Sequence, residues 1–138
     1  MTGALVIPVR GGVSAISGLA ESLARFCEEH GIACDVGAHV TLAIEEIVVN
    51  VIRYGYRHAP DRTVDVRVEL AAGTITATIA DDAEPFDPLQ APPPDLSAPL
   101  RDRRVGGLGI HLARRLMDDV VYRREGNRNI VVLTKRVA

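Results

Sequence analysis

The sequence predicts an α/β (α+β) protein, a two-layer sandwich in which helices cover one face of a mixed, mostly antiparallel sheet. Two strictly alternating apolar stretches, 63–70 and 74–81, are separated by the short sequence AAG, which is typical of a β-hairpin. Stretches 13–31 and 35–56 instead repeat apolar residues every three or four positions, as amphipathic helices do. A length of 138 residues suits a single domain spanning residues 1–138.

The N-terminal elements follow from these patterns. Residues 4–9, ALVIPV, predict a first strand, and Pro8 indicates a sheet edge or a strand end. The first helix has Gly31 as its expected C-terminal cap. The second helix is expected to begin at an Asp35 cap and to run to residue 56. Its apolar stripe comprises Val36, Val40, Ile44, Ile47 and Val51.

A long loop and three further elements complete the chain. Six of the eight prolines lie between Pro85 and Pro99, so residues 82–107 predict a loop, and loops of this length are usually functional. Residues 108–118 predict a third helix, entered through glycines. Residues 120–125 and 129–137 predict a closing hairpin. Because most strands pair with sequence neighbours, the sheet is expected to be largely antiparallel.

Composition and charge restrict the protein class. Hydrophobic residues make up 47% and charged residues 25% of the chain, which indicates a globular protein. The N-terminus does not resemble a signal peptide, so a cytoplasmic location is expected. Cys27 and Cys34 fit neither a redox motif nor a zinc spacing, and are expected to be reduced and buried or half-buried. Residues 1–100 hold 6 basic and 14 acidic side chains, and residues 101–138 hold 10 and 4. The basic part is either a solvated face or a surface for an anion or acidic partner.

Glu46 and Asn50 are the first candidate site residues. Their i, i+4 spacing places them on one face of the second predicted helix. An asparagine carbonyl oxygen is a good ligand for Mg²⁺, and a neighbouring carboxylate can act as a general base. The alternative is a solvated polar face. Glu45, beside them, is expected to be the solvated glutamate.

Two further features bear on chemistry. Asp81 ends a predicted strand, where its carboxylate is able to accept a hydrogen bond from an exocyclic amine such as that of adenine; the alternative is an ordinary turn acid. Gly106, Gly107 and Gly109 lead directly into the third predicted helix. Glycines allow close backbone approach and a helix N-terminus favours phosphate, although a hinge is the alternative. The glycines match neither the P-loop nor the dinucleotide fingerprint.

The combined order of these features resembles the GHKL ATPase superfamily, and more closely its anti-sigma-factor serine/threonine kinases of the SpoIIAB and RsbW type. The stretches that carry the resemblance are LAIEEIVVNVIRYGY, DDAEPFDP, GGLGIHLARRLMD and GNRNIVVLTKR. The resemblance covers essentially the whole chain and implies the Bergerat fold. It also implies ATP and Mg²⁺ as cofactors, with a lid at about residues 88–106.

The resemblance assigns roles to individual residues. It implies that Asn50 holds Mg²⁺, that Glu46 is the general base and that Asp81 binds the adenine amino group. It implies further nucleotide contacts by Arg53, Ala83, Phe86, Gly106, Gly107, Leu108, Gly109, Ile110 and Thr134. In the family's Asp-x-Gly adenine motif the third residue is glycine, whereas here Ala83 adds a methyl group.

The function implied is that of an ATP-dependent serine/threonine protein kinase and anti-sigma factor. Such a protein phosphorylates a STAS-type anti-sigma-factor antagonist, sequesters a sigma factor and is usually a homodimer, without direct nucleic-acid or membrane contact. The alternative is a non-catalytic ATP-binding or protein-interaction module of the same fold. A histidine kinase is not expected, because no dimerisation helix with a phospho-acceptor histidine precedes the domain.

Overall fold

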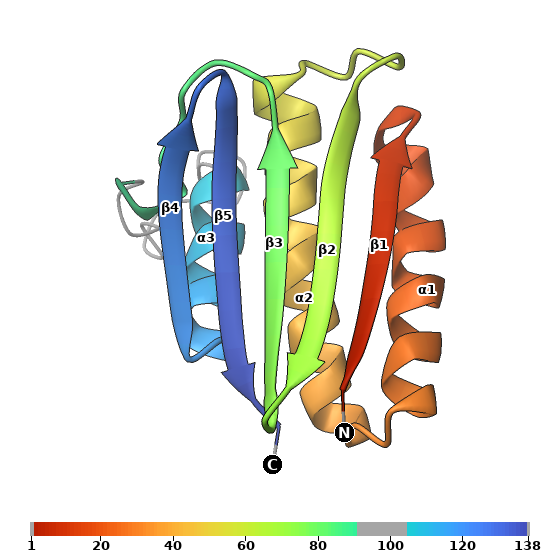
Figure 1. The fold of residues 1–138 in the computed structure, drawn as a ribbon. Helices are drawn as coiled ribbons and strands as arrows, with labels where there is room; N and C mark the ends of the chain where they lie inside the picture. Colours follow the sequence, from red (N-terminus) through yellow and green to blue (C-terminus); the bar gives the residue numbers. More distant parts are fainter. Residues whose placement is uncertain (1, 91–104, 138) are drawn as a thin grey trace.

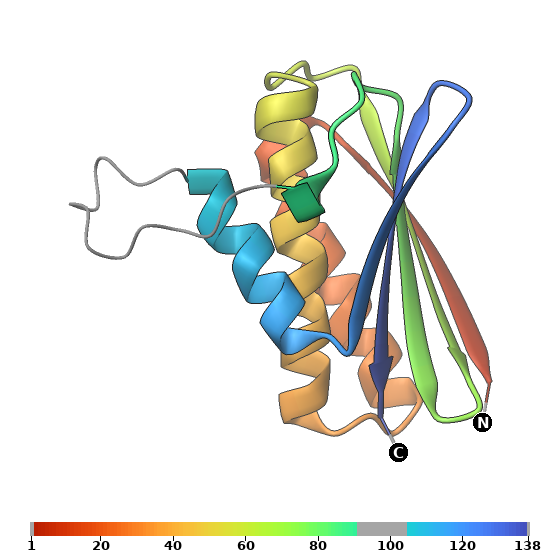
Figure 2. The same cartoon turned by 90° about the vertical axis from the view of Figure 1, so that its left-hand side faces the viewer.

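The fold is a single layer of strands with helices packed on one side (Figures 1 and 2). The computed structural model describes residues 2–90 and 105–137, and the side chains of residues 2–89 and 110–137. The strands are β1 (Gly3–Arg10), β2 (Thr63–Ala71), β3 (Thr74–Asp81), β4 (Asp119–Glu125) and β5 (Arg128–Arg136). The α-helices are α1 (Ile16–Glu29), α2 (Cys34–Asn50) and α3 (Val105–Leu116). Short turns of helix span Gly12–Ala15, Val51–Gly55 and Pro88–Gln90.

The sheet has the strand order β1-β2-β3-β5-β4. The two-layer architecture and the edge position of β1 with its Pro8 are confirmed. All four strand pairings in the described residues are antiparallel, so the expected mixed component is wrong. The reason is that β5 lies between β3 and β4, which run parallel to each other on either side of it. The register aligns Asp81 of β3 with Asn129 of β5.

The core lies between the sheet and the helices. On β2 the side chains of Val64, Val66, Val68 and Leu70 are buried, while the residues between them are exposed. Helix α2 packs between α1 and α3 and buries Val40, Ala43, Ile44, Ile47 and Val48. Burying one such large apolar side chain contributes about 1.5–3 kcal/mol. The central position of α2 therefore holds its C-terminal end firmly beside the end of β3.

The ends of two helices differ from expectation. Ala33, not Asp35, is the N-cap of α2. Asp35 lies inside the first turn, where its carboxylate accepts the Val36 N–H at 2.9 Å, and its charge is favourable there. The helix was expected to continue to residue 56, but it changes to a π-helix over Val51–Gly55. Such π turns often occur at functional sites.

The third helix also begins earlier than expected. Helix α3 begins at Val105, so Gly106, Gly107 and Gly109 lie within its first turns and do not precede it. Gly31, in contrast, follows α1 with a φ of +67°, which confirms its expected capping role.

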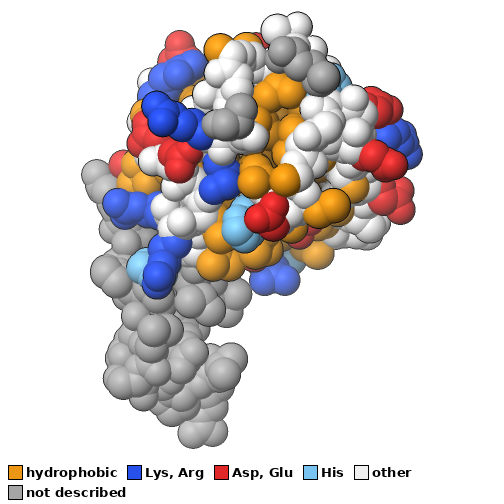
Figure 3. All heavy atoms as spheres, turned by 90° about the horizontal axis from the view of Figure 1, so that it is seen from below, with side chains coloured by type: hydrophobic (Ala, Val, Ile, Leu, Met, Phe, Trp, Pro, Cys, Tyr) orange, Lys and Arg blue, Asp and Glu red, His pale blue; other side chains and the backbone are white. Residues whose placement is uncertain are grey.

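The surface reflects the uneven charge of the sequence. Viewed from below, most visible Lys and Arg side chains lie on the side of α3 and β4, whereas Asp and Glu side chains are visible on both sides (Figure 3). Both cysteines are free thiols. Cys27 is buried as expected, but Cys34 is exposed at the first position of α2, so the expectation of burial is wrong for Cys34. Burial raises the pKa of Cys27. No helix among the described residues has the length and apolar character needed to cross a membrane.

Candidate functional site

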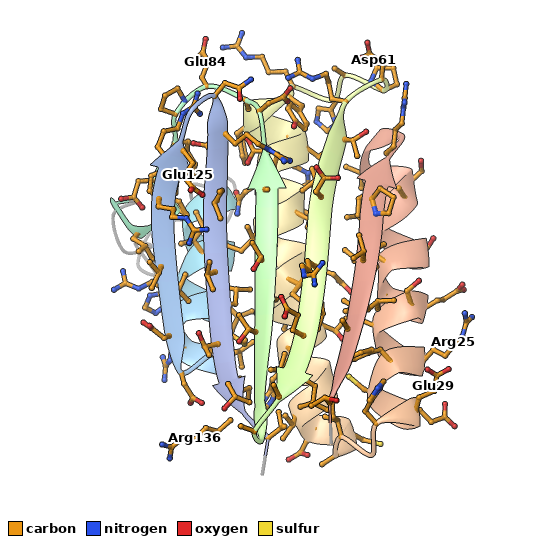
Figure 4. The ribbon with its side chains drawn as sticks, viewed as in Figure 1. Arg25, Glu29, Asp61, Glu84, Glu125 and Arg136 are labelled. Carbon is orange, nitrogen blue, oxygen red and sulfur yellow. The ribbon has the colours of Figure 1, made fainter. Side chains whose placement is uncertain are left out.

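A pocket lies where the end of α2 meets the ends of β3 and β5. Three buried polar residues line it: Asn50 from α2, Asp81 from β3 and Asn129 from β5. The chain that follows β3 forms another wall. The pocket is lined by Ile47, Asn50, Val51, Gly55, Asp81, Ala83, Glu84, Phe86, Pro88, Asn129 and Val131. Figure 4 shows Glu84 at this end of the sheet, with Arg136 at the opposite end. The structure therefore brings together two candidates that lie 31 positions apart in the sequence.

Asp81 is only 4% exposed, and its two oxygens differ. Oδ1 accepts the Ala83 N–H at 2.9 Å and Asn129 Nδ2 at 2.9 Å. No hydrogen bond to Oδ2 is recorded within the described part of the chain. Because Asp81 lines the pocket, Oδ2 is the oxygen available to a ligand there. A carboxylate oxygen at the pocket wall is suited to accept a hydrogen bond from an amine.

Asn50 has a similar division between its two ends. Its Nδ2 donates to the backbone carbonyl of Glu46 at 2.8 Å, one helical turn earlier. One of the two Nδ2 hydrogens is thereby used and the amide is oriented, which leaves Oδ1 for a ligand. This is the atom that a hard cation such as Mg²⁺ prefers. Among the side chains of residues 2–89 and 110–137, no cluster of three His, Cys, Asp or Glu residues is arranged to hold a metal ion.

The Asn129 side chain joins the elements around the pocket. It is 3% exposed, and its Nδ2 donates to Asp81 Oδ1 and to the Glu84 carbonyl, both at 2.9 Å. Its Oδ1 accepts from the Tyr122 hydroxyl at 2.6 Å and from the Phe86 N–H at 3.2 Å. Asn129 was not among the site residues predicted from the sequence. The feature that could have identified it is its polar amide at the start of the otherwise apolar stretch predicted as the last strand.

Thr134, which was expected near the base, lies elsewhere. It pairs with Thr76, far along the strand from Asp81. The side chains of Asn129, Val131 and Leu133 are buried on the helix side, and alternation along β5 turns Thr134 to the opposite face. The expected contact of Thr134 with the base is therefore wrong, and Asn129 is the β5 side chain that lies beside Asp81.

The methyl group of Ala83 lies beside Gly55, which has no side chain. Ala83 is 8% exposed, and its Cβ lies 3.0 Å from the point where a Cβ on Gly55 would stand. That separation is too short for two methyl groups. The methyl group at residue 83 therefore fits because residue 55 is glycine.

The sequence profile of the histidine kinase-like ATPase domain matches residues 13–135 of this chain. The chain belongs to the histidine kinase-like ATPase family. Such a domain implies ATP binding, and the buried side chains of Asp81 and Asn50 line the pocket described above.

Curated relatives of this chain carry names from anti-sigma kinase systems. It is 27% identical to the serine/threonine-protein kinase BtrW of Bordetella bronchiseptica over 72% of this chain and 70% of the relative. It is 26% identical to the serine-protein kinase RsbW of Listeria monocytogenes, over 84% and 76%. It is 22% identical to the anti-sigma F factor of Geobacillus stearothermophilus, over 83% and 79%.

Solved structures of other chains share the fold. The RsbU and RsbW domains of Rv1364c from Mycobacterium tuberculosis match with a TM-score of 0.71 at 18% identity, covering 98% of this chain. This chain spans 32% of that longer protein. The Acinetobacter baumannii histidine kinase AdeS matches with a TM-score of 0.53 at 14% identity, over 98% of this chain and 68% of that chain. Both matches support the architecture of this ATPase domain.

The remaining expected residues are distributed around the pocket. Glu46 is half-buried one turn before Asn50, on the same helix face, and is not part of the pocket wall. Glu45 is also half-buried, and burial, reinforced by the charge of Glu46, raises its pKa, so the expectation of a solvated Glu45 is wrong. Phe86 lines the pocket but is 52% exposed. Arg53 is exposed and lies outside the wall.

The expected phosphate-binding region is described only in part. Ile110 is buried in the core, so a backbone contact alone remains for it. The side chain of Leu108 and the environment of Gly106, Gly107 and Gly109 lie outside the described residues, as does most of the expected lid, residues 91–104. The backbone of α3 from Val105 is described, and the first four N–H groups of any α-helix lack helical partners.

A polar brace supports the far side of the pocket. The Tyr56 hydroxyl lies 2.8 Å from Asp82 Oδ1 and 2.9 Å from the Thr63 carbonyl, and it accepts the Asp82 N–H at 3.0 Å. Arg62 donates to Asp82 at 2.6 Å and stacks over the Tyr56 ring. Burial, reinforced by the Asp82 charge, raises the pKa of Tyr56 to about 12. The Arg62 hydrogen bond holds the pKa of Asp82 below its usual range. The brace fixes the backbone directly after Asp81.

Proposed function

We propose that this protein is an ATP-dependent serine/threonine protein kinase and anti-sigma factor. One observation carries the proposal: the buried side chains of Asp81 and Asn50, a carboxylate and an amide, line the same pocket. The names of the relatives, serine-protein kinase RsbW and anti-sigma F factor, support the kinase and its role in transcription regulation.

Each residue has a defined part in this proposal. Asp81 Oδ2 accepts a hydrogen bond from the adenine amino group, with Ala83 and Phe86 packing beside the base. Asn50 Oδ1 ligates Mg²⁺, which when bound neutralises phosphate charge. Glu46 accepts the proton of the attacking hydroxyl at its carboxylate. Backbone groups of residues 106–110 lie near the phosphates, where the N-terminal end of α3 favours negative charge, and Arg53 adds positive charge.

The partners are proposed from the family. The acceptor is a serine or threonine of a STAS-domain anti-sigma-factor antagonist, and the second partner is a sigma factor that is sequestered when the antagonist is phosphorylated. We also propose a cytoplasmic homodimer with a nucleotide lid at about residues 88–106. The basic side formed by α3 and β4 is suited to acidic segments of a partner.

A matched pair of glutamates tests the kinase. Purified protein is incubated with labelled ATP and a purified STAS-domain antagonist, and phosphate on the antagonist is measured. Glu46→Ala should abolish transfer while ATP binding, measured by calorimetry, is retained. Glu45→Ala is the control, because it removes the adjacent carboxylate and should retain transfer. Persistent transfer by Glu46→Ala would exclude Glu46 as the base.

The alternative is a nucleotide-binding switch or interaction module without transfer. The half-buried Glu46 beside Asn50 favours the kinase, because a protein that only binds nucleotide needs no base there. Calorimetry with Mg-ATP separates these classes. Binding without transfer would favour the switch, and no binding at millimolar nucleotide would leave the interaction module.

A further inference from the structure

The orientation of the Asp81 carboxylate is fixed by two donors on one oxygen. Both the Ala83 N–H and Asn129 Nδ2 reach Oδ1 at 2.9 Å. Their combined effect is to occupy Oδ1 and to leave Oδ2 for a ligand in the pocket. Which of the two oxygens meets a bound base is thus decided by Asn129 as well as by the backbone.

Asn129 is itself held in one orientation. Its Oδ1 accepts three donors, the Tyr122 hydroxyl at 2.6 Å, the Phe86 N–H at 3.2 Å and Arg124 Nη1 at 3.2 Å. A flipped amide would turn its NH₂ toward the Phe86 N–H and Arg124, and its carbonyl oxygen toward the Asp81 carboxylate. Each of these contacts would become repulsive, and only the Tyr122 hydroxyl could adapt by accepting a hydrogen bond. The amide therefore has a single favourable orientation, with Nδ2 on Asp81.

The same network holds the chain that follows Asp81. Asn129 Nδ2 donates to the Glu84 carbonyl at 2.9 Å, and Arg124 of the edge strand β4 donates to the Ala83 carbonyl at 2.9 Å. Because Asn129 is 3% exposed and all its polar atoms have protein partners, it has no remaining donor for a ligand. Its action on a ligand must pass through Asp81.

We propose that Asn129 is a positioning residue for purine recognition, fixing Asp81 so that a hydrogen-bond acceptor, Oδ2, meets the group at position 6 of the base. The inference rests on the proposed nucleotide-binding function and adds a specificity rule to it. A 6-amino purine donates to Oδ2, whereas a 6-oxo purine presents a second acceptor and is rejected.

Asp81→Asn reverses the polarity of the site and tests the rule. The two donors on Oδ1 should hold the carbonyl oxygen of the new side chain in place, so that its NH₂ occupies the position of Oδ2 and donates to a 6-oxo group. The ratio of ITP to ATP affinity, measured by calorimetry, should rise at least about tenfold over the unmodified protein. Adding Asn129→Ala to Asp81→Asn should return the ratio toward the unmodified value. A ratio that Asn129→Ala leaves unchanged would overturn the inference.

Asn129→Ala alone should weaken ATP binding about tenfold, since a hydrogen bond to a charged group is lost. Asn127→Ala, at an exposed asparagine of the same hairpin, is the matched control and should bind ATP normally. If Asn129→Ala does not fold, Tyr122→Phe serves instead; it removes the 2.6 Å donor to Asn129 and should weaken binding less. Normal ATP affinity in the folded variant would exclude the positioning role.

Amide hydrogen exchange separates this inference from the proposed function. In the protein without nucleotide, the Ala83 N–H should lose protection in Asn129→Ala and retain it in Asn127→Ala. Unchanged protection would overturn the positioning role whether or not nucleotide binds. If the unmodified protein binds neither ATP nor ITP, the proposed function fails, while the exchange result still decides how Asp81 is held.

Discussion

At the scale of single residues, hydrogen bonds hold each polar side chain of the site in one orientation. Asn50 uses its donor on the Glu46 carbonyl, and Asp81 uses one oxygen on Ala83 and Asn129. Each side chain is left with one free acceptor. Ala83 replaces the glycine of the family motif, and its methyl group occupies space that is open because Gly55 has no side chain.

Gly55→Ala should lower the free energy of unfolding by about 1–3 kcal/mol, because the new Cβ would stand 3.0 Å from that of Ala83. The measurement is urea unfolding of the two single variants and the double variant. Ala83→Gly should relieve most of this loss when the two changes are combined. Additive effects of the two substitutions would contradict the proposed contact.

Tyr56→Phe should lower stability by about 1–3 kcal/mol, since the Asp82 carboxylate loses a partner. The substitution should also change how the free energy of unfolding depends on pH above about pH 10. The folded pKa of about 12 exceeds the ordinary value of 10.0, so the unfolded chain loses this proton first. The stability due to the raised pKa is fully present below pH 10 and is lost as the pH rises toward 12. The stability difference from Tyr56→Phe, measured by urea unfolding, should therefore shrink across that range, and a constant difference would refute it.

At the scale of elements, close packing between helices fixes the position of the C-terminal end of α2. Gly37 is buried where α2 crosses α1, and a Cβ there would meet Cys27 Sγ at 3.2 Å. This close approach at the start of α2 and the buried stripe along its length fix the helix against the sheet. As a result Asn50, at its last turn, is delivered to the pocket.

The contact between α1 and α2 gives an element-level prediction. Gly37→Ala gains about 1 kcal/mol of helix propensity but must displace the Cys27 sulfur. In a Cys27→Ala background the new methyl group instead fills part of the vacated space. Gly37→Ala should therefore stabilise the Cys27→Ala protein by at least about 1 kcal/mol more than it stabilises the unmodified protein. Thermal unfolding of the four proteins provides the measurement, and equal effects in both backgrounds would exclude the contact.

At the scale of the whole molecule, the pocket region combines the acidic part of the chain, residues 1–100, with the basic part, residues 101–138. Asn50 and Asp81 belong to the acidic first part, whereas Asn129 and Arg124 belong to the basic second part. Nucleotide binding would link these parts and should stabilise the entire domain. A ligand at 100 times its Kd adds about 2.7 kcal/mol.

Mg-ATP should therefore raise the Tm by several degrees more than ATP with a chelator. Asn50→Ala should remove the difference between the two conditions while leaving the smaller effect of ATP itself. Asn50→Asp retains an oxygen ligand and should restore a Mg²⁺ effect. The check is thermal unfolding of the three proteins with and without Mg²⁺; a full Mg²⁺ effect in Asn50→Ala would exclude Asn50 as the ligand.

The sequence by itself determined the layers and most elements of this protein. The apolar periods of 63–70, 74–81 and the helices are local properties, so they predict strands and helices without knowledge of the partners. Helix ends were less well predicted, since Asp35 and the π turn at Val51–Gly55 depend on packing. Glu46, Asn50 and Asp81 were identified because their order along the chain resembles a family pattern.

Only the tertiary structure decided which β5 side chain accompanies Asp81. Asn129 and Thr134 are five positions apart, and because strand residues alternate between faces, an odd separation puts them on opposite sides of the sheet. The register between β3 and β5 then places Asn129 opposite Asp81, across a separation of 48 residues. Local pattern cannot fix such a register, because it is set when two distant strands and the helices on their buried face pack together.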